Sequence, residues 1–384
     1  MTGKEKFKAA LSPGGSAEFP AAICYHGIFL RDHWAEVTGQ PWWAFFERSA
    51  QRATPPWADM IRRTGEDWFA IPGGFKHEDQ QAVSIERSGD GVFLLDKRTG
   101  KQTPLEKPPV GGEQSWAARE AKPLAHGVGT LDKLDELMDR LYGPRPGSAD
   151  AIFDNGTMDA ARILIREFGQ EKLPLAHITS PFWYCYSLWG FEGMMVGLVE
   201  TPELIIHTCR RFLDANLRNI KRLAASGVEA VWIEDCMTDM LSPEQSRRFS
   251  LPWLRALTEA IRATGMLSVH YYCGRFDDRW DLLTDSGADA LALEESKKGF
   301  VIDIADVAQR LDGRMALLGN VDAIGVLERG SEEDLHREIA RQCAAGRTNR
   351  NRFAVSIGSP VTPGTPLSRV RRYCDLVHEL GHST

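Results

Sequence analysis

The chain has 384 residues, a formal net charge of −7 and a hydrophobic fraction of 43%. This composition is that of a folded globular protein, and the negative charge, without a long run of Lys or Arg, argues against a nucleic-acid or anionic-membrane partner. No stretch has the pattern of a signal peptide or reaches the roughly 18 consecutive apolar residues of a membrane span, so we expect a cytosolic protein. The seven cysteines lie at scattered positions, and we expect reduced thiols rather than a disulfide framework.

Eight short aliphatic or β-branched segments, each bounded by turn residues, are predicted to be strands. In chain order they cover residues 21–26, 151–154, 175–179, 230–235, 267–272, 288–294, 315–319 and 353–358. Amphipathic helical patterns separate most neighbours, and this alternation predicts parallel strands with right-handed crossovers. We therefore predict that residues 1–384 form one α/β domain, a (β/α)₈ TIM barrel.

The stretch from 30 to 148 is too long for a single crossover, so we predict an inserted segment that forms a cap after the first strand. Within it, residues 82–105 alternate between apolar and polar side chains around turn residues near Gly89 and Gly100. This pattern predicts an antiparallel β-meander.

Acidic and imidazole side chains stand where several predicted strands end, which is where barrels of this kind carry their functional groups. A carboxylate there can act as a general acid or base, particularly if burial raises its pKa. The predicted catalytic residues are Glu234, Asp235, His270, Glu294 and Glu295. In the alternative interpretation, Glu234 and Asp235 cap the barrel mouth or hold a substrate hydroxyl, and Glu294 and Glu295 pair with Lys297 or Lys298.

A zinc site is a further prediction for the ends of the fourth and fifth strands. Zinc accepts carboxylate, imidazole and thiolate ligands and can leave one position open. We predict Glu234, His270 and Cys273 as metal ligands, with Cys236 as an alternative thiolate. Because side chains alternate along a strand, His270 and Cys273 meet only if the strand ends before Cys273. A hydrogen-bonded polar layer without metal is the competing interpretation.

Further polar and aromatic residues near the strand ends are predicted to bind a small-molecule substrate. They are His26, Arg31, Trp183, Tyr184, Tyr272 and Asn320. Core packing is the alternative role for the aromatic members of this set. A homodimer is compatible with the sequence, which does not decide the oligomeric state.

Several motifs, in this order, resemble those of the uroporphyrinogen decarboxylase superfamily, which includes that decarboxylase and the cobalamin-linked methyltransferases. The similarity runs from about Phe19 to the C-terminus. The motifs are Thr179-Ser-Pro-Phe, Thr201-Pro-Glu-Leu, Glu234-Asp-Cys, Leu241-Ser-Pro-Glu, His270-Tyr-Tyr-Cys-Gly, Leu318-Gly-Asn-Val-Asp and Gly358-Ser-Pro-Val-Thr-Pro-Gly-Thr-Pro.

Departures from the family patterns point to one branch. The first loop of the decarboxylases resembles an Arg-x-x-x-Arg pattern, whereas this chain has Arg31 and, at the position of the second arginine, Ala35. Without that second cation, a substrate with several carboxylates is hard to bind. In the methyltransferases that act on thiols, the family pattern has a Cys on the eighth strand, and this chain has Ser359 at that position. The resemblance is therefore strongest to the O-demethylase branch.

That resemblance implies a methyltransferase that demethylates a small methoxylated or methylated substrate onto a corrinoid. The corrinoid would be carried by a partner protein, and zinc would assist. The alternatives are a cofactor-free decarboxylase or lyase acting on a different carboxylic acid, and a barrel that binds a ligand without turnover, because one barrel fold hosts many activities.

Overall fold

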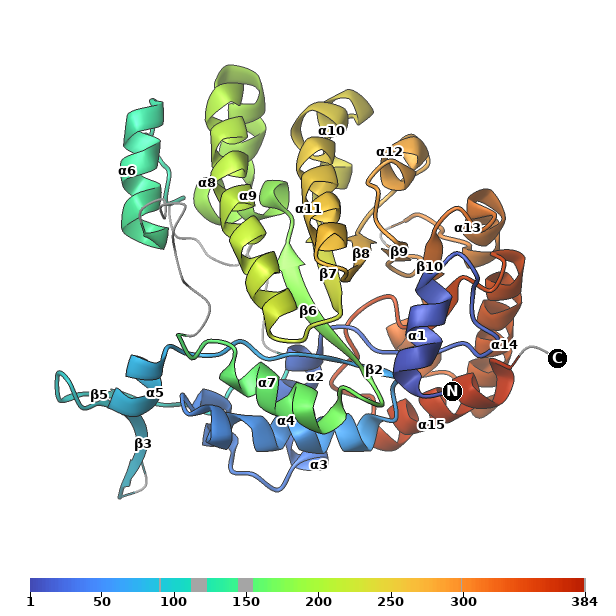
Figure 1. The fold of residues 1–384 in the computed structure, drawn as a ribbon, viewed down its shortest axis with the longest axis horizontal. Helices are drawn as coiled ribbons and strands as arrows, with labels where there is room; N and C mark the ends of the chain where they lie inside the picture. The colour runs from blue at the N-terminus through green and yellow to red at the C-terminus, as the bar shows by residue number, and fades with distance from the viewer. Residues whose placement is uncertain (90, 112–122, 144–154, 298, 383–384) are drawn as a thin grey trace.

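The computed structural model describes residues 1–89, 91–111, 123–143, 155–297 and 299–382. Eight strands form one parallel sheet in the order β1-β11-β10-β9-β8-β7-β6-β2, and helices are arranged around it (Figure 1). The strands are β1 (Ala21–Ala22), β2 (Trp68–Ala70), β6 (Leu173–Thr179), β7 (Ala230–Asp235), β8 (Leu267–Tyr272), β9 (Ala290–Leu293), β10 (Ala316–Leu318) and β11 (Phe353–Ser356). The predicted TIM-like α/β fold is confirmed.

The two ends of this strand order, β1 and β2, are joined by one backbone hydrogen bond and two that involve side chains. The backbone N–H of Asp67 donates to the carbonyl of Ala21 at 2.9 Å, and the Asp67 carboxylate accepts from the Ala21 N–H at 2.8 Å. The indole Nε1 of Trp68 donates to the carbonyl of Ile23 at 2.9 Å. Buried backbone groups need partners, so these side chains replace part of the missing strand ladder and nearly close the barrel.

The second barrel strand differs from the sequence prediction. The predicted segment 151–154 lies outside the described residues, and β2 occupies the place beside β6, with Trp68 opposite Leu173. Three buried residues are too few to show a strand periodicity, which is why the sequence did not indicate β2. The first strand is also shorter than predicted, because Tyr25 adopts a left-handed conformation with φ 60° and His26 begins a helix.

The predicted β-meander is present as a small antiparallel sheet of β3 (Val83–Ser88), β4 (Gly91–Asp96) and β5 (Lys101–Pro104). It follows β2 rather than β1, because the segment predicted to be a single insertion supplies a barrel strand first. Figure 1 shows this sheet at the periphery of the molecule, next to α5.

The helices of the described residues follow the strands along the chain. They are α1 (Gly3–Leu11), α2 (His26–Asp32), α3 (Trp34–Val37), η1 (Trp42–Phe46), α4 (Ala50–Thr64), α5 (His77–Ala82), α6 (Leu131–Tyr142), α7 (Asp159–Phe168), α8 (Pro181–Glu200), α9 (Pro202–Ala225), η4 (Thr238–Met240), α10 (Pro243–Phe249), α11 (Leu251–Ala263), α12 (Trp280–Thr284), α13 (Ile304–Leu311), η5 (Ala323–Glu328), α14 (Glu332–Thr348) and α15 (Leu367–Leu380). Capping boxes at Ser242 and Ser331 begin α10 and α14. No helix in the described part of the chain combines the length and apolarity needed to cross a lipid bilayer.

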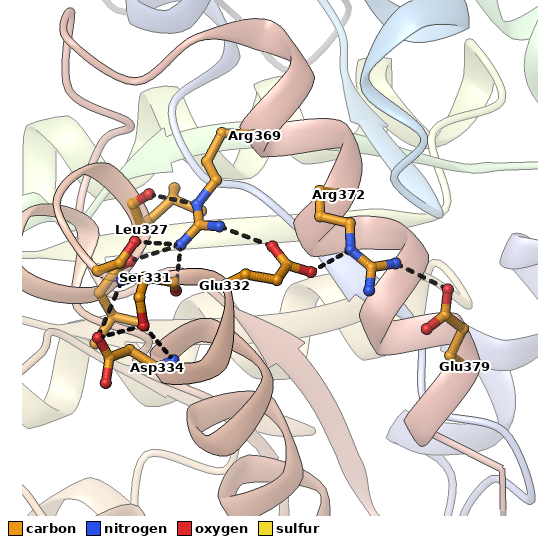
Figure 2. Close-up of polar contacts among 9 residues, drawn as sticks. Leu327, Ser331, Glu332, Asp334, Arg369, Arg372 and Glu379 are labelled. Atoms are coloured by element: carbon orange, nitrogen blue, oxygen red, sulfur yellow. Dashed lines mark hydrogen bonds and ion pairs between the residues drawn. The ribbon is translucent and has the colours of Figure 1, made fainter.

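Arg369 of α15 ties together the end of η5 and the start of α14 (Figure 2). Its guanidinium donates to the carbonyls of Leu327, Gly330 and Ser331 at 2.7–3.0 Å and pairs with Glu332 at 3.0 Å. The last carbonyls of a helix have no partner within that helix. The arginine therefore satisfies acceptors that would otherwise be left open in the outer helical layer.

One cluster of buried side chains draws on every strand of the barrel and must therefore fill its interior. Its strand members alternate along the chain, for example Ala230 and Trp232 on β7 and Val269 and Tyr271 on β8. The residues between them, such as Ile233 on β7, pack instead in a separate cluster with the surrounding helices. This alternation decides which strand-end residues face the mouth of the barrel.

Candidate active site

Two cysteines extend the interior face of β7 and β8 to the barrel mouth. Cys236 and Cys273 pack against the interior cluster, and their Sγ atoms are 3.1 Å apart. The hydrogen bond with Cys273, followed by burial, raises the pKa of the Cys236 thiol well above its ordinary value. The Cys236 thiol therefore keeps its proton at neutral pH.

His177 and Glu234 lie beside these thiols on the same face. Nδ1 of His177 on β6 is 3.8 Å from Oε1 of Glu234 on β7. The His177 ring stacks on Trp232, with centroids 5.7 Å apart, and Tyr25 packs against both rings. Burial, followed by the charges of Tyr271 and Glu234, raises the pKa of Tyr25, so its phenol also keeps its proton.

His177 also lines a cavity of about 450 Å³ between the end of β6 and helices α6 and α9. The cavity is rich in aromatic side chains: the rings of Tyr142, Tyr184 and Phe212 pack edge to face or at a tilt. Among the described residues, no hydrogen-bond partner reaches the buried Nε2 of His177. His177 thus combines a place in the cavity wall with one buried ring nitrogen that has no partner among the described residues.

A lysine and two glutamates follow β9 and meet Ser359, which follows β11. Nζ of Lys297 is 3.0 Å from Oε2 of Glu294 and 3.5 Å from Oε1 of Glu295. It also donates to Ser359, whose hydroxyl donates to Glu295 at 2.7 Å. Burial acts to lower the pKa of Lys297, but Glu295 and Glu294 outweigh it and raise the pKa. The alternative pairing with Lys297 is thus what the structure contains, and residue 298 lies outside the described residues.

Asp235 and His270, both predicted to be catalytic, lie behind the barrel wall. His270 is 1% exposed, and its Nε2 is 3.4 Å from Oδ2 of Asp235. Asp235 accepts from the hydroxyls of Ser180 at 2.8 Å and Thr238 at 3.3 Å. Both residues line a cavity of about 20 Å³ beneath α10 and α11, away from the interior cluster. Their arrangement is that of a buried structural network.

The structure does not bring the predicted zinc ligands Glu234, His270 and Cys273 together. Strand β8 continues through Tyr272 and turns only at Gly274, where φ is 120°. Although β8 ends at Tyr272, Cys273 packs against the interior cluster while His270 lines the small cavity under α10 and α11, so the two side chains lie on opposite sides of the barrel wall. In residues 1–89, 91–111, 123–143, 155–297 and 299–382, no three His, Cys, Asp or Glu side chains form a group able to hold a metal ion.

Of the predicted substrate-binding residues, Tyr184 lines the 450 Å³ cavity. Its neighbour Trp183 packs against Tyr186, with ring centroids 5.5 Å apart. Arg31 pairs with Asp32 at 2.7 Å and, with Trp34 and other residues, lines a separate small cavity.

The other three predicted substrate-binding residues have structural partners inside the protein. Nε2 of His26 is 2.9 Å from the fully buried Glu66. Tyr272 donates to the carbonyl of Arg275 at 3.0 Å, and Asn320 donates to the carbonyl of Glu294 at 3.3 Å. Asn320 thereby supports the strand end that carries Glu294, without facing the cavity described above.

Sequence reasoning undervalued His177 and Lys297. The sequence pattern assigns no role to His177, and it indicates Lys297 only as a partner of Glu294 or Glu295. A signal existed in the periodicity, because His177, two residues after Leu175, falls on the interior face of β6. Without the cavity and the neighbouring strand, that position alone could not distinguish a core histidine from a functional one.

The fold and its polar strand ends define a class, the (β/α)₈-barrel proteins with an enzyme-type site at the carboxyl ends of the strands. Residues 149–380 match the model of the uroporphyrinogen decarboxylase (URO-D) family. The chain belongs to this family.

Individual relatives agree with this assignment. The chain is 30% identical over 194 residues to the uroporphyrinogen decarboxylase of Xanthomonas euvesicatoria, which covers 48% of the chain and 52% of the relative. It is 27% identical over 231 residues to the chloroplastic uroporphyrinogen decarboxylase 2 of Arabidopsis thaliana, covering 58% and 56%. The chain thus matches about half the length of these curated relatives.

A solved structure matches the whole chain. A methyltransferase from Methanosarcina mazei superposes with a TM-score of 0.66 at 15% sequence identity, covering 99% of each chain. At this identity the likeness establishes the fold.

Proposed function

We propose that this protein is a methyltransferase that removes a methyl group from a small methoxylated or methylated substrate and transfers it to a corrinoid carried by a partner protein. Membership of the URO-D family and the fold shared over its full length with a methyltransferase support this proposal. The observation that carries it is the unpartnered Nε2 of His177, among the described residues, beside an aromatic cavity.

The cavity suits a small aromatic molecule. Its volume of about 450 Å³ falls within the range of ligand pockets, roughly 300–1,000 Å³. Aromatic rings pack favourably edge to face, and Tyr142, Tyr184 and Phe212 offer such surfaces. Arg211, Asp214 and Arg218 also line the cavity, and Asp135 and Asp139 neutralise the charge of Arg211.

His177 is the proposed proton donor to the departing oxygen. When bound, the corrinoid supplies the nucleophile for the methyl carbon. The oxygen that loses the methyl group develops negative charge, and a positioned acid lowers that barrier. Glu234, 3.8 Å from Nδ1, orients the imidazole. In this proposal the buried Nε2 is the atom that gives its proton to the substrate oxygen once the substrate is bound.

The predicted zinc ligands do not fit a metal, because His270 faces the helical layer. No step is therefore assigned to zinc. In this proposal His177 carries the stabilising role that the sequence prediction gave to the metal.

The test is methyl transfer from methoxylated and methylated aromatic compounds to a reduced corrinoid carrier. His177→Gln should reduce the rate by at least about 10²-fold, the lower range for loss of a general acid. His336→Gln, on the exposed face of α14, is the matched control and should keep the wild-type rate. Equal rates in the two variants would remove His177 from the reaction, and absence of transfer by the wild-type protein to any corrinoid would refute the methyltransferase.

A decarboxylase or lyase acting on a different carboxylic acid is the second candidate. Lys297 favours it, because this cation keeps its proton at the strand ends between Glu294 and Glu295. It could hold one substrate carboxylate or protonate the carbon from which CO₂ leaves. Release of CO₂ from a candidate acid by the wild-type protein, lost in Lys297→Met, would establish this candidate in place of methyl transfer.

A further inference from the structure

Cys236 and Cys273 occupy equivalent positions at the ends of two neighbouring parallel strands. The residues that precede them, Asp235 and Tyr272, are register partners. The residues that follow them, Met237 and Gly274, both have positive φ, 61° and 120°. The chain therefore turns away directly after each cysteine, and both thiols stop side by side at the barrel mouth.

Their separation is close to that of a disulfide. The two Sγ atoms are 3.1 Å apart. Adjacent strands lie about 4.8 Å apart, which falls within the Cα separation of roughly 4.4–6.8 Å that disulfides span. A small rotation of the side chains, without a shift of either strand, would bring the sulfur atoms to bonding distance.

A second cysteine pair provides an internal comparison. Cys185 on α8 and Cys209 on α9 have Sγ atoms 3.4 Å apart, but both side chains are 0% exposed. Cys236 and Cys273 are only partly buried. Proximity is thus similar in the two pairs, whereas access from the barrel mouth distinguishes them.

We propose that Cys236 and Cys273 form a reversible dithiol–disulfide pair at the mouth of the barrel, oxidised by low-molecular-weight disulfides. One thiol loses its proton and attacks the reagent, forming a mixed disulfide and releasing one reagent thiol. The second cysteine, also deprotonated, then displaces the other half of the reagent. Two electrons pass to the reagent, which leaves as two thiols, and a Cys236–Cys273 bond remains.

Oxidation would change the candidate active site directly. Glu234 lies two residues before Cys236, and the ring of Tyr25 lies beside Tyr271, two residues before Cys273. The bond would join the ends of β7 and β8 and remove two thiols from this environment. Access of substrate to the mouth would then depend on the thiol–disulfide balance around the protein.

The experiment treats the full-length protein with glutathione disulfide at graded ratios to glutathione, followed by alkylation and peptide mapping. The expected result is one intramolecular link, Cys236–Cys273, with loss of two of the seven thiols titrated after unfolding. Addition of excess glutathione should restore both thiols. Cys185 and Cys209 should stay reduced throughout.

Two variants sharpen the test. Cys236→Ala should leave Cys273 to accumulate as a mixed disulfide with glutathione, whereas Cys343→Ala, which removes a buried thiol, should form the link like the wild type. The proposal is overturned if glutathione disulfide modifies Cys236 and Cys273 only singly in the wild-type protein, or if it leaves both unmodified. Linkage of Cys185 to Cys209 at the same rate would also overturn it, because access would then not be the deciding factor.

Discussion

At the residue scale, Glu234 and Asp235 are neighbours in sequence with opposite surroundings. Asp235 is 2% exposed and accepts hydrogen bonds from Ser180 and Thr238. Asp235→Ala leaves these buried donors without their acceptor, so we expect a loss of about 2–4 kcal/mol in the free energy of unfolding. Urea denaturation measures this loss.

Glu234→Gln is the matched comparison, because the Glu234 side chain is 20% exposed at the barrel mouth. We expect a change in unfolding free energy within about 0.5 kcal/mol together with reduced turnover. A strongly destabilised Glu234→Gln and a fully stable Asp235→Ala would contradict the placement of these two side chains.

The thiol of Cys236 allows a prediction about pH. Its hydrogen bond with Cys273, burial and nearby carboxylates raise its pKa well above the ordinary value, and only the thiolate reacts with alkylating reagents. Because the pKa is raised, the thiolate fraction is small at pH 7. The rate of alkylation of Cys236 by iodoacetamide should rise about tenfold per pH unit from 7 to 9. Peptide mapping measures it, and a rate that levels off below pH 8 would contradict a raised pKa.

At the scale of elements, Arg369 connects three segments of the outer layer (Figure 2). Its side chain is 15% exposed, and it donates to carbonyls at the end of η5 and before α14. Arg369→Ala removes these charge-assisted hydrogen bonds, so we expect a loss of about 2–3 kcal/mol in unfolding free energy. Arg372→Ala is the control, since Arg372 is 39% exposed and forms surface ion pairs with Glu332 and Glu379, worth at most about 1 kcal/mol. Equal losses would show that Arg369 acts only as a surface ion pair.

At the scale of the whole molecule, Asp67 decides how the barrel closes. Its carboxylate accepts from the Ala21 N–H and from Nε2 of His378, both at 2.8 Å. We expect Asp67→Ala to lower the unfolding free energy by about 2–4 kcal/mol and to speed amide hydrogen exchange in β1 and β2 more than in β7 and β8. Asp277→Ala, which removes an exposed ion pair with Arg275, should change neither. Uniform acceleration across all strands would contradict a local opening between β1 and β2.

Much of the barrel can be predicted from the sequence, because the patterns that indicate its strands and helices are local. Buried strands such as β7 and β8 are rich in aliphatic and aromatic residues, and the starts of α10 and α14 follow from the capping residues Ser242 and Ser331. The order of these signals was sufficient to predict parallel strands around one core. Strand β2 was not predicted, because its three residues form a strand only through pairing with β6.

For the candidate site, the sequence by itself determined which chemical groups stand at the strand ends, whereas the tertiary structure decided which of them meet. Alternation places Glu234 and Cys273 inside the barrel and turns His270 toward the helices, because β8 continues to Tyr272 before it turns. The environments of His177 and Lys297 depend on residues far away in the chain, such as Phe212 and Ser359. The sequence pattern indicates the alternation of side chains along a strand. It does not indicate where the strand ends or which residues it faces, because these are fixed only when all eight strands pack together.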